Sequence, residues 1–152
     1  ERFVAAVLST LLGDSSNSRI YWELIDKGLV DNAGFDNQEF EDGGMFIAYA
    51  SCDPNNLDKV EKTLLSIIDS PLEFTDEQLE SAKTKLATRL ALQGESTMRR
   101  MVSIGLEYLF NKEYFSISDE VRNIKAVRRV DIENLVENYD WSNKTVVRLL
   151  GH

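Results

Sequence analysis

The chain has 152 residues, of which 43% are hydrophobic and 28% charged, proportions ordinary for a soluble globular protein with a buried core. Its 17 basic and 26 acidic residues leave a net charge of −9, which argues against nucleic-acid binding through phosphate neutralisation. A single cysteine excludes an internal disulfide and a cysteine-rich metal site, and no apolar run is long enough to span a membrane. The sequence starts without Met inside a helical pattern, so we expect one domain over residues 1–152 that is a fragment of a larger protein.

The first elements are marked by apolar spacing and by glycine. Apolar residues at helical spacing predict a helix over residues 3–12, and Gly13 supplies its stop. A short second helix is expected over residues 18–27, with Gly28 just after its end, where a left-handed residue is needed. Residues 30–37 then predict a strand.

The middle of the chain combines an apolar run with two helix starts. Residues 45–50 are all apolar, which predicts a strand covered on both faces. Asp53 and Pro54 predict the start of the next helix, with Asp as N-cap and Pro in the first turn. Thr75 and Gln78 have the spacing of a capping box and predict the start of another helix.

The last third is predicted to be mainly helical. Residues 94–96 interrupt the preceding helix, the next helix covers about residues 97–110, and two short ones open near Ser118 and Asp131. Residues 144–150 predict a closing strand. The order of elements predicts a two-layer α+β fold, a mixed or antiparallel sheet with helices packed on one face. Six apolar residues of the 97–110 helix are expected to belong to the core: Met98, Met101, Leu106, Tyr108, Leu109 and Phe110.

Three stretches carry a resemblance to a known family. They are the Ser-Arg-Ile-Tyr and Lys-Gly-Leu-Val motifs within residues 11–30, the Asp-Pro helix start at 53–54, and Thr-Asp-Glu-Gln-Leu-Glu-Ser-Ala-Lys at 75–83. In this order they resemble the C-terminal, non-catalytic half-domain of the insulinase/pitrilysin-type zinc metallopeptidases, a fold similar to that of mitochondrial processing peptidase. The family half-domain begins with a strand before its first helix, and that first strand is missing here.

The resemblance also implies where the metal chemistry would stand. Peptide-cleaving members carry His-x-x-Glu-His on a helix, which places two imidazoles on one zinc and a Glu beside the bound water. Ala6, Ser9 and Thr10 stand at the His, Glu and His positions of the counterpart helix, and none can replace them. We therefore expect no catalytic residue and no metal ligand in this chain. Zinc is expected in the partner half-domain.

A second family feature is an Arg and a Tyr that help to hold the substrate. Ile25 and Asp31 stand at or near those positions, and neither can stabilise an oxyanion. The substrate-facing residues implied by the resemblance are Lys27, Asp31 and Asn32. The resemblance implies that this chain alone is not an enzyme, whereas the full-length protein is a zinc metalloendopeptidase whose peptide chamber this domain helps to wall.

The implied partners are a catalytic half-domain, upstream in the same chain or on a separate subunit, and a peptide substrate. The missing strand also makes an edge-strand dimer of the fragment an expectation. An alternative is a structural or assembly subunit that has lost proteolysis, like the core proteins of the respiratory cytochrome complex. A third option is an acidic peptide-binding module that works alone.

Other groups have simpler explanations. Cys52 and His152 could form a thiol–imidazole dyad, although a filler cysteine and a disordered terminal histidine are favoured. The 13–18 loop before Arg19 could bind an anion, but helix capping explains it as well. For the acidic stretch, a solvated surface is favoured over calcium binding. For the basic stripe, a solvated surface is favoured over partner binding. The acidic stretch comprises Asp31, Asp36, Glu39, Glu41 and Asp42, and the basic stripe Arg122, Lys125 and Arg129.

Overall fold

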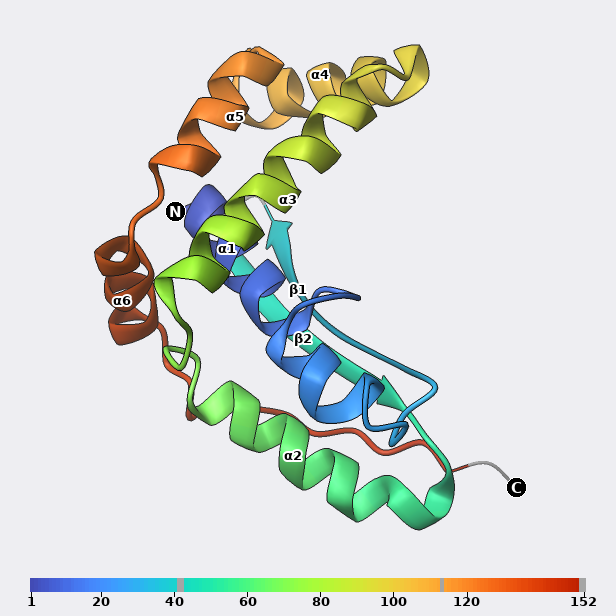
Figure 1. Ribbon diagram of the computed structural model, residues 1–152. Helices are drawn as coiled ribbons and strands as arrows, with labels where there is room; N and C mark the ends of the chain where they lie inside the picture. The colour runs from blue at the N-terminus through green and yellow to red at the C-terminus, as the bar shows by residue number, and fades with distance from the viewer. Residues whose placement is uncertain (41–42, 113, 151–152) are drawn as a thin grey trace.

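The computed structural model describes residues 1–40, 43–112 and 114–150 (Figure 1). A π-helical turn at Tyr21–Ile25 and a 3₁₀ turn at Pro54–Asn56 join the longer elements. The combination of a β-hairpin and packed helices confirms the predicted α+β class. The longer elements are α1 (Arg2–Gly13), β1 (Asn32–Phe40), β2 (Gly43–Ser51), α2 (Leu57–Asp69), α3 (Asp76–Gly94), α4 (Thr97–Asn111), α5 (Ile117–Ala126) and α6 (Arg129–Asn138).

The sheet is an antiparallel hairpin of β1 and β2, paired from Asn32 opposite Ser51 to Phe40 opposite Gly43. Helix α1 crosses one face of this hairpin, and α3 lies over α1 (Figure 1). The helix and strand meet closely at Gly13, where an added Cβ would lie 2.2 Å from the backbone nitrogen of Phe35. Gly13 is therefore required by packing as well as by the end of the helix.

The core surrounds α1, which contacts β1, α3, α5 and α6. Leu8 and Leu12 of α1 are fully buried, and α2 closes the opposite side against β2 and the π-helical turn. Apolar burial from all these elements supplies the main driving force for folding. The buried apolar residues of this core cluster are Val7, Leu8, Leu11, Leu12, Ile20, Leu24, Val30, Ala33, Phe35, Val60, Ile67, Ile68, Phe74, Leu79, Ala82, Ile124, Val127 and Ile132.

Local signals placed several boundaries correctly. Gly28 has φ +64, the left-handed conformation expected after the second helical segment. The side chain of Asp53 accepts a hydrogen bond from the backbone nitrogen of Asn55 at 2.8 Å, as a cap should. Thr75 and Gln78 form the predicted capping box. These side chains satisfy backbone donors that the helix itself leaves unpaired.

Residues 45–50 lie in strand β2, which confirms the predicted strand, but the prediction that both of its faces are covered is wrong. Strand β2 has no buried residue, and its Met45 and Tyr49 side chains are exposed. One face is partly covered at Phe46, whose ring lies 5.2 Å from that of Phe35 and 5.3 Å from that of Trp141. Within the described residues the sheet has only two strands, so β2 is an edge strand.

The predicted closing strand at residues 144–150 is also not formed. The segment makes no backbone ladder with β1 or β2 and instead runs alongside α2 (Figure 1). Lys144 pairs with Asp69 of α2, and Arg148 pairs with Glu61 at 2.5 Å. These ion pairs hold the segment on α2, where its β-branched residues find no strand edge to join.

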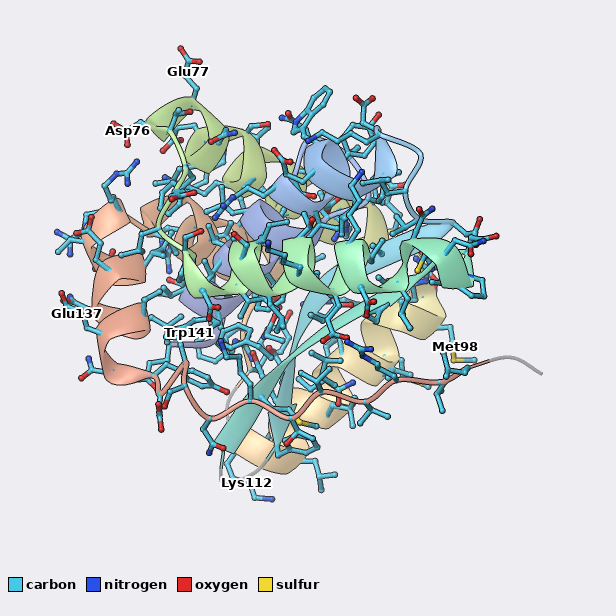
Figure 2. The ribbon with its side chains drawn as sticks, turned by 90° about the horizontal axis from the view of Figure 1, so that it is seen from below. Asp76, Glu77, Met98, Lys112, Glu137 and Trp141 are labelled. Carbon is cyan, nitrogen blue, oxygen red and sulfur yellow. The ribbon has the colours of Figure 1, made fainter. Side chains whose placement is uncertain are left out.

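The prediction that the apolar residues of the 97–110 helix belong to the core is wrong as well. Met98, Met101 and Leu106 of α4 are exposed, as are Tyr108 and Leu109. The side chain of Phe110 lies outside the described residues. Figure 2 shows α4 running from Met98 towards Lys112 at the border of the molecule.

In the described part of the chain, no helix combines the length and apolar character needed to cross a membrane.

Candidate functional site

The three residues at the metal-ligand positions all lie on α1. Ser9 and Thr10 are buried, and their hydroxyls are already engaged within the fold. Thr10 Oγ1 donates to the carbonyl oxygen of Ala6 at 2.9 Å, and Ser9 Oγ donates to Asn37 Oδ1 at 3.3 Å. Zinc in proteins is bound by thiolates, imidazoles and carboxylates, none of which stands at these positions. The residues present do not fit a zinc ion.

A polar pocket of about 240 Å³ lies beside these residues, between α1, α3 and the hairpin. The phenol ring of Tyr49 from β2 lines this pocket, and Tyr49 lies opposite Gly34 of β1. A Cβ at Gly34 would be 2.7 Å from Tyr49 Oη, so only glycine leaves room for this ring. The polar side chains that line the pocket are Ser9, Thr10, Asp14, Ser15, Asp36, Asn37, Tyr49 and Arg89.

Asp14 fixes the loop after α1 to α3. Its side chain is only 3% exposed, and its two oxygens accept hydrogen bonds from Lys85 Nζ at 2.7 Å and Arg89 Nη2 at 2.5 Å. Burial alone would raise the pKa of Asp14, but the hydrogen bonds and charges of Lys85 and Arg89 outweigh it. The pKa of Asp14 therefore lies below its ordinary value of 3.8. Asp14 is an ionised, paired carboxylate at the rim of the pocket.

Arg19 is used to hold the end of α2. Its guanidinium donates to the carbonyl oxygens of Ile67 and Ser70, to the Ser70 hydroxyl at 3.1 Å, and to Glu73 at 2.9 Å. The last carbonyls of a helix carry partial negative charge and lack partners within the helix. These contacts support a structural role for Arg19 over an anion-binding one.

Arg19→Met is expected to lower the free energy of unfolding by about 1 to 2 kcal/mol, because buried carbonyls at the end of α2 lose their charged donor. Methionine keeps the apolar stem of the side chain, which limits the change to the guanidinium. Urea titration followed by circular dichroism measures the difference. Glu73→Gln is the control, because the Glu73 carboxylate is exposed and its pairing should contribute less than about 0.5 kcal/mol. Equal effects of the two substitutions would contradict the role assigned to the backbone contacts.

The three residues implied as substrate contacts lie at the surface. Lys27, Asp31 and Asn32 are exposed, and none of them lines the polar pocket. Lys27 pairs with Glu23 at 2.5 Å, and the backbone nitrogen of Asp31 donates to the Ser51 carbonyl at 2.7 Å. The pairing to Ser51 makes Asp31 an extension of the β1–β2 ladder.

Ile25, which stands at the family Arg position, is half-buried against the core. Because the side chain is apolar and packs against the core, it offers no hydrogen-bond donor at that position. Cys52 is also half-buried against the core, whereas His152 lies outside the described residues, so the thiol–imidazole dyad stays untested.

The described residues of the charged stretches lie mostly at the surface. Asp36 and Glu39 are exposed, and Glu41 and Asp42 lie outside the described residues. Arg122 pairs with Asp119 on its own helix. Among residues 1–40, 43–112 and 114–150, no group of three or more His, Cys, Asp or Glu side chains is placed to hold a metal ion.

Sequence reasoning missed the pocket around Asp14. Lys85 and Arg89 are one turn apart on α3, so they share a helix face, and this spacing was readable in the sequence. Their partner Asp14 lies 71 positions before Lys85 and 75 positions before Arg89. Only the packing of α3 over α1 brings the three together.

A second buried polar cluster lies where α4 and α5 meet the start of α1. Glu107 Oε1 accepts from Arg2 Nη2 at 2.6 Å, but Glu107 Oε2 and Glu120 Oε1 are buried and have no hydrogen-bond partner among the described residues. Burial and the neighbouring charge of Glu107 raise the pKa of Glu120 above its ordinary value of 4.5, against the opposing charges of Arg2 and Arg100. The ionised form of Glu120 is therefore disfavoured in the folded protein.

Glu120→Gln is expected to raise the free energy of unfolding at pH 7 by about 1 kcal/mol, because it removes a buried charge. A carboxyl whose pKa is raised by folding favours the folded state at acid pH. That contribution is lost as the pH rises from the unfolded value near 4.5 through the folded one. The gain should thus vanish near pH 4. Urea titrations from pH 4 to 8 measure this, and a gain that does not depend on pH would contradict it.

Residues 1–86 match the family described as the peptidase M16 inactive domain. The chain belongs to this family. Its helix α1 lies within the matched region and lacks zinc-binding side chains at residues 6, 9 and 10, in keeping with that description.

Two curated relatives of this M16 inactive domain are described as uncharacterized zinc proteases. One, from Streptomyces coelicolor, is 31% identical over 134 residues, which cover 86% of this chain and 29% of the relative. The other, from Bacillus subtilis, is 26% identical over 132 residues, which cover 85% of this chain and 32% of the relative. The chain therefore spans about a third of the length of these relatives.

Solved structures share the fold. A protease from Helicobacter pylori has a TM-score of 0.77 at 21% identity, covering 91% of this chain and 34% of that one. The inactive peptidase domain of a proposed zinc protease from Bordetella parapertussis has a TM-score of 0.72 at 19% identity, covering 87% and 73%. These likenesses confirm the half-domain fold implied by the sequence.

Proposed function

We propose that this M16 inactive domain is the non-catalytic C-terminal domain of a zinc metalloendopeptidase and forms a wall of its peptide chamber. The observation that carries the proposal is made on helix α1. There the Ser9 hydroxyl donates to Asn37 and the Thr10 hydroxyl donates to the Ala6 carbonyl. Relatives about three times as long are described as zinc proteases. A metal-free domain in such a family supports a division of labour between two domains.

In this division the partner domain supplies zinc, which activates a water molecule for attack on the peptide bond. The partner lies upstream in the same chain or on a separate subunit. This domain supplies contacts to an extended peptide at the start of β1. Asp31 and Asn32 suit that role because they are exposed at the end of a strand ladder, and Lys27 adds a positive charge in the preceding turn. They position the peptide and take no part in the chemistry.

The proposal is tested in the longer protein that contains this domain. Replacing Asp31 and Asn32 together with Ala should raise KM for an unfolded peptide several-fold and leave kcat nearly unchanged, because only binding contacts are lost. Glu137→Ala on the exposed surface of α6 is the control and should change neither parameter. A fall in kcat without a change in KM would contradict the assigned role.

A structural subunit that has lost proteolysis is the second candidate. It is favoured by Ile25 and Asp31, which stand where active family members use an Arg and a Tyr. Ile25 packs against the core and cannot reach a substrate carbonyl with a hydrogen bond. A longer protein that holds one zinc per chain yet cleaves no unfolded peptide would favour this candidate over a peptidase.

The chain of residues 1–152 purified alone is expected to hold no stoichiometric zinc and to cleave no peptide, because residues 6, 9 and 10 offer no ligand. Elemental analysis before and after dialysis against a chelator measures the metal content. One tightly held zinc per chain that chelation removes would overturn the assignment of this domain as metal-free.

A further inference from the structure

Helix α4 has its polar face turned inward and its apolar face turned outward. The half-buried positions are Arg100, Ser103, Ile104 and Glu107, three of them polar, whereas the outward face is mainly apolar. The outward side chains with their exposed fractions are Met98 67%, Met101 60%, Val102 47%, Leu106 49% and Leu109 58%. A surface helix normally turns its apolar stripe towards the core of its own domain.

The polar side chains of α4 make contacts that fit this orientation of the helix. Arg2 binds Glu107 at 2.6 Å, and Arg100 donates to the Tyr114 hydroxyl at 2.7 Å and to the Phe115 carbonyl at 3.4 Å. Rotating the helix to bury its apolar side chains would break these charged contacts. The apolar face is therefore held outward by the fold itself.

We propose that this face is the docking site for a second copy of the chain, with two α4 helices packed antiparallel about a two-fold axis. The α4 stripe is defined as Met98, Met101, Val102, Gly105, Leu106 and Leu109. Its members recur at i, i+3, i+4, i+7, i+8 and i+11, the spacing of a continuous helix–helix contact. The proposal does not depend on the peptidase role of the longer protein.

Gly105 lies near the middle of α4 and marks the crossing point. Among the described residues, nothing lies within 4 Å of a Cβ built at Gly105, so they give no packing reason for glycine there. Glycine inside a helix costs about 1 kcal/mol relative to alanine. A two-fold crossing at Gly105 lets the two backbones approach closely, because the distance between helix axes depends on the side chains at the contact.

The area of the α4 stripe also fits a second copy. Covering the five exposed side chains would bury roughly 600 Å² per copy, about 1,200 Å² in all, the lower limit for specific interfaces. The expected dimer is therefore weak and reversible.

The test is sedimentation velocity of residues 1–152 over a wide concentration range. The parent should pass from monomer to dimer as concentration rises, and Leu106→Glu should raise the dissociation constant by at least about 100-fold, because a charge would be buried without a partner. Leu149→Glu is the matched control: Leu149 is 91% exposed and lies off the α4 stripe, so association should be unchanged. Circular dichroism checks that each variant keeps the fold.

Gly105→Leu separates a specific crossing from general stickiness. A bulky side chain at the crossing should force the helices apart and weaken association, whereas non-specific apolar contact would be strengthened by the added leucine. A chain that stays monomeric at all concentrations would overturn the proposal and leave the face to another domain. Association that survives Leu106→Glu would also overturn it and would place the contact elsewhere, with the β2 edge as the next surface to test.

Discussion

Asp14→Ala is expected to lower the free energy of unfolding at pH 7 by about 2 to 3 kcal/mol, because two cations lose their buried partner. Lys85 and Arg89 are 32% and 48% exposed, so water screens part of the cost and the effect falls below that of a fully buried pair. The loop also loses the hydrogen bond from the backbone nitrogen of Ser16 to Asp14. Urea titration measures the change.

Asp76→Ala is the matched control. Asp76 pairs with Arg129 at 3.0 Å, but its side chain is 85% exposed, so the expected change is under about 0.5 kcal/mol. Similar losses for the two variants would contradict the view that burial makes the Asp14 pairing important.

The pH dependence gives a second check on Asp14. Its pKa is lowered by folding, so its contribution is fully present above the unfolded value near 3.8 and is lost as pH falls through the folded value. Asp14→Asn should therefore differ most from the parent at neutral pH and approach it as the pH falls below 3.8 and through the folded value. A constant difference across this range would contradict the assigned ionised state.

The parts of the fold that depend on neighbouring residues could be predicted from the sequence. The capping box at Thr75 and the left-handed Gly28 are set by three or four consecutive residues, and both are confirmed. The end of α3 at Gly94 is another local signal. Such features follow from backbone hydrogen bonding and φ preferences, which act over one helical turn.

The three errors share one physical cause. Residues 45–50, residues 144–150 and the outward face of α4 are all rich in apolar side chains, and all three were expected in the interior or in a sheet. Apolar composition predicts that a surface is covered but does not say which chain covers it. In the described residues these surfaces remain largely exposed. The candidate pocket was missed for a related reason, because its polar side chains meet only after α3 packs on α1.

The exposed outer edge of β2 leads to the largest expected gain in stability. We propose that residues 1–152 are one domain within a longer protein, in which a strand preceding α1 pairs with this edge. Such a strand would pair with the free backbone groups of β2, and its side chains would lie beside those of residues 45–50. Unpaired strand edges readily accept another strand, because their backbone donors and acceptors are free.

Extending the chain at its amino end by the roughly 15 to 25 residues that precede it in the longer protein would supply one strand and its connection. We expect the melting temperature to rise by about 10 °C, since a gain of about 3 kcal/mol corresponds to that shift in a chain of this size. Amide exchange should slow along β2, where new ladder hydrogen bonds form. An extension of the same composition in scrambled order is the control and should give neither effect. If the authentic extension has no more effect than the scrambled one, no preceding strand pairs with the edge of β2, and this proposal is wrong.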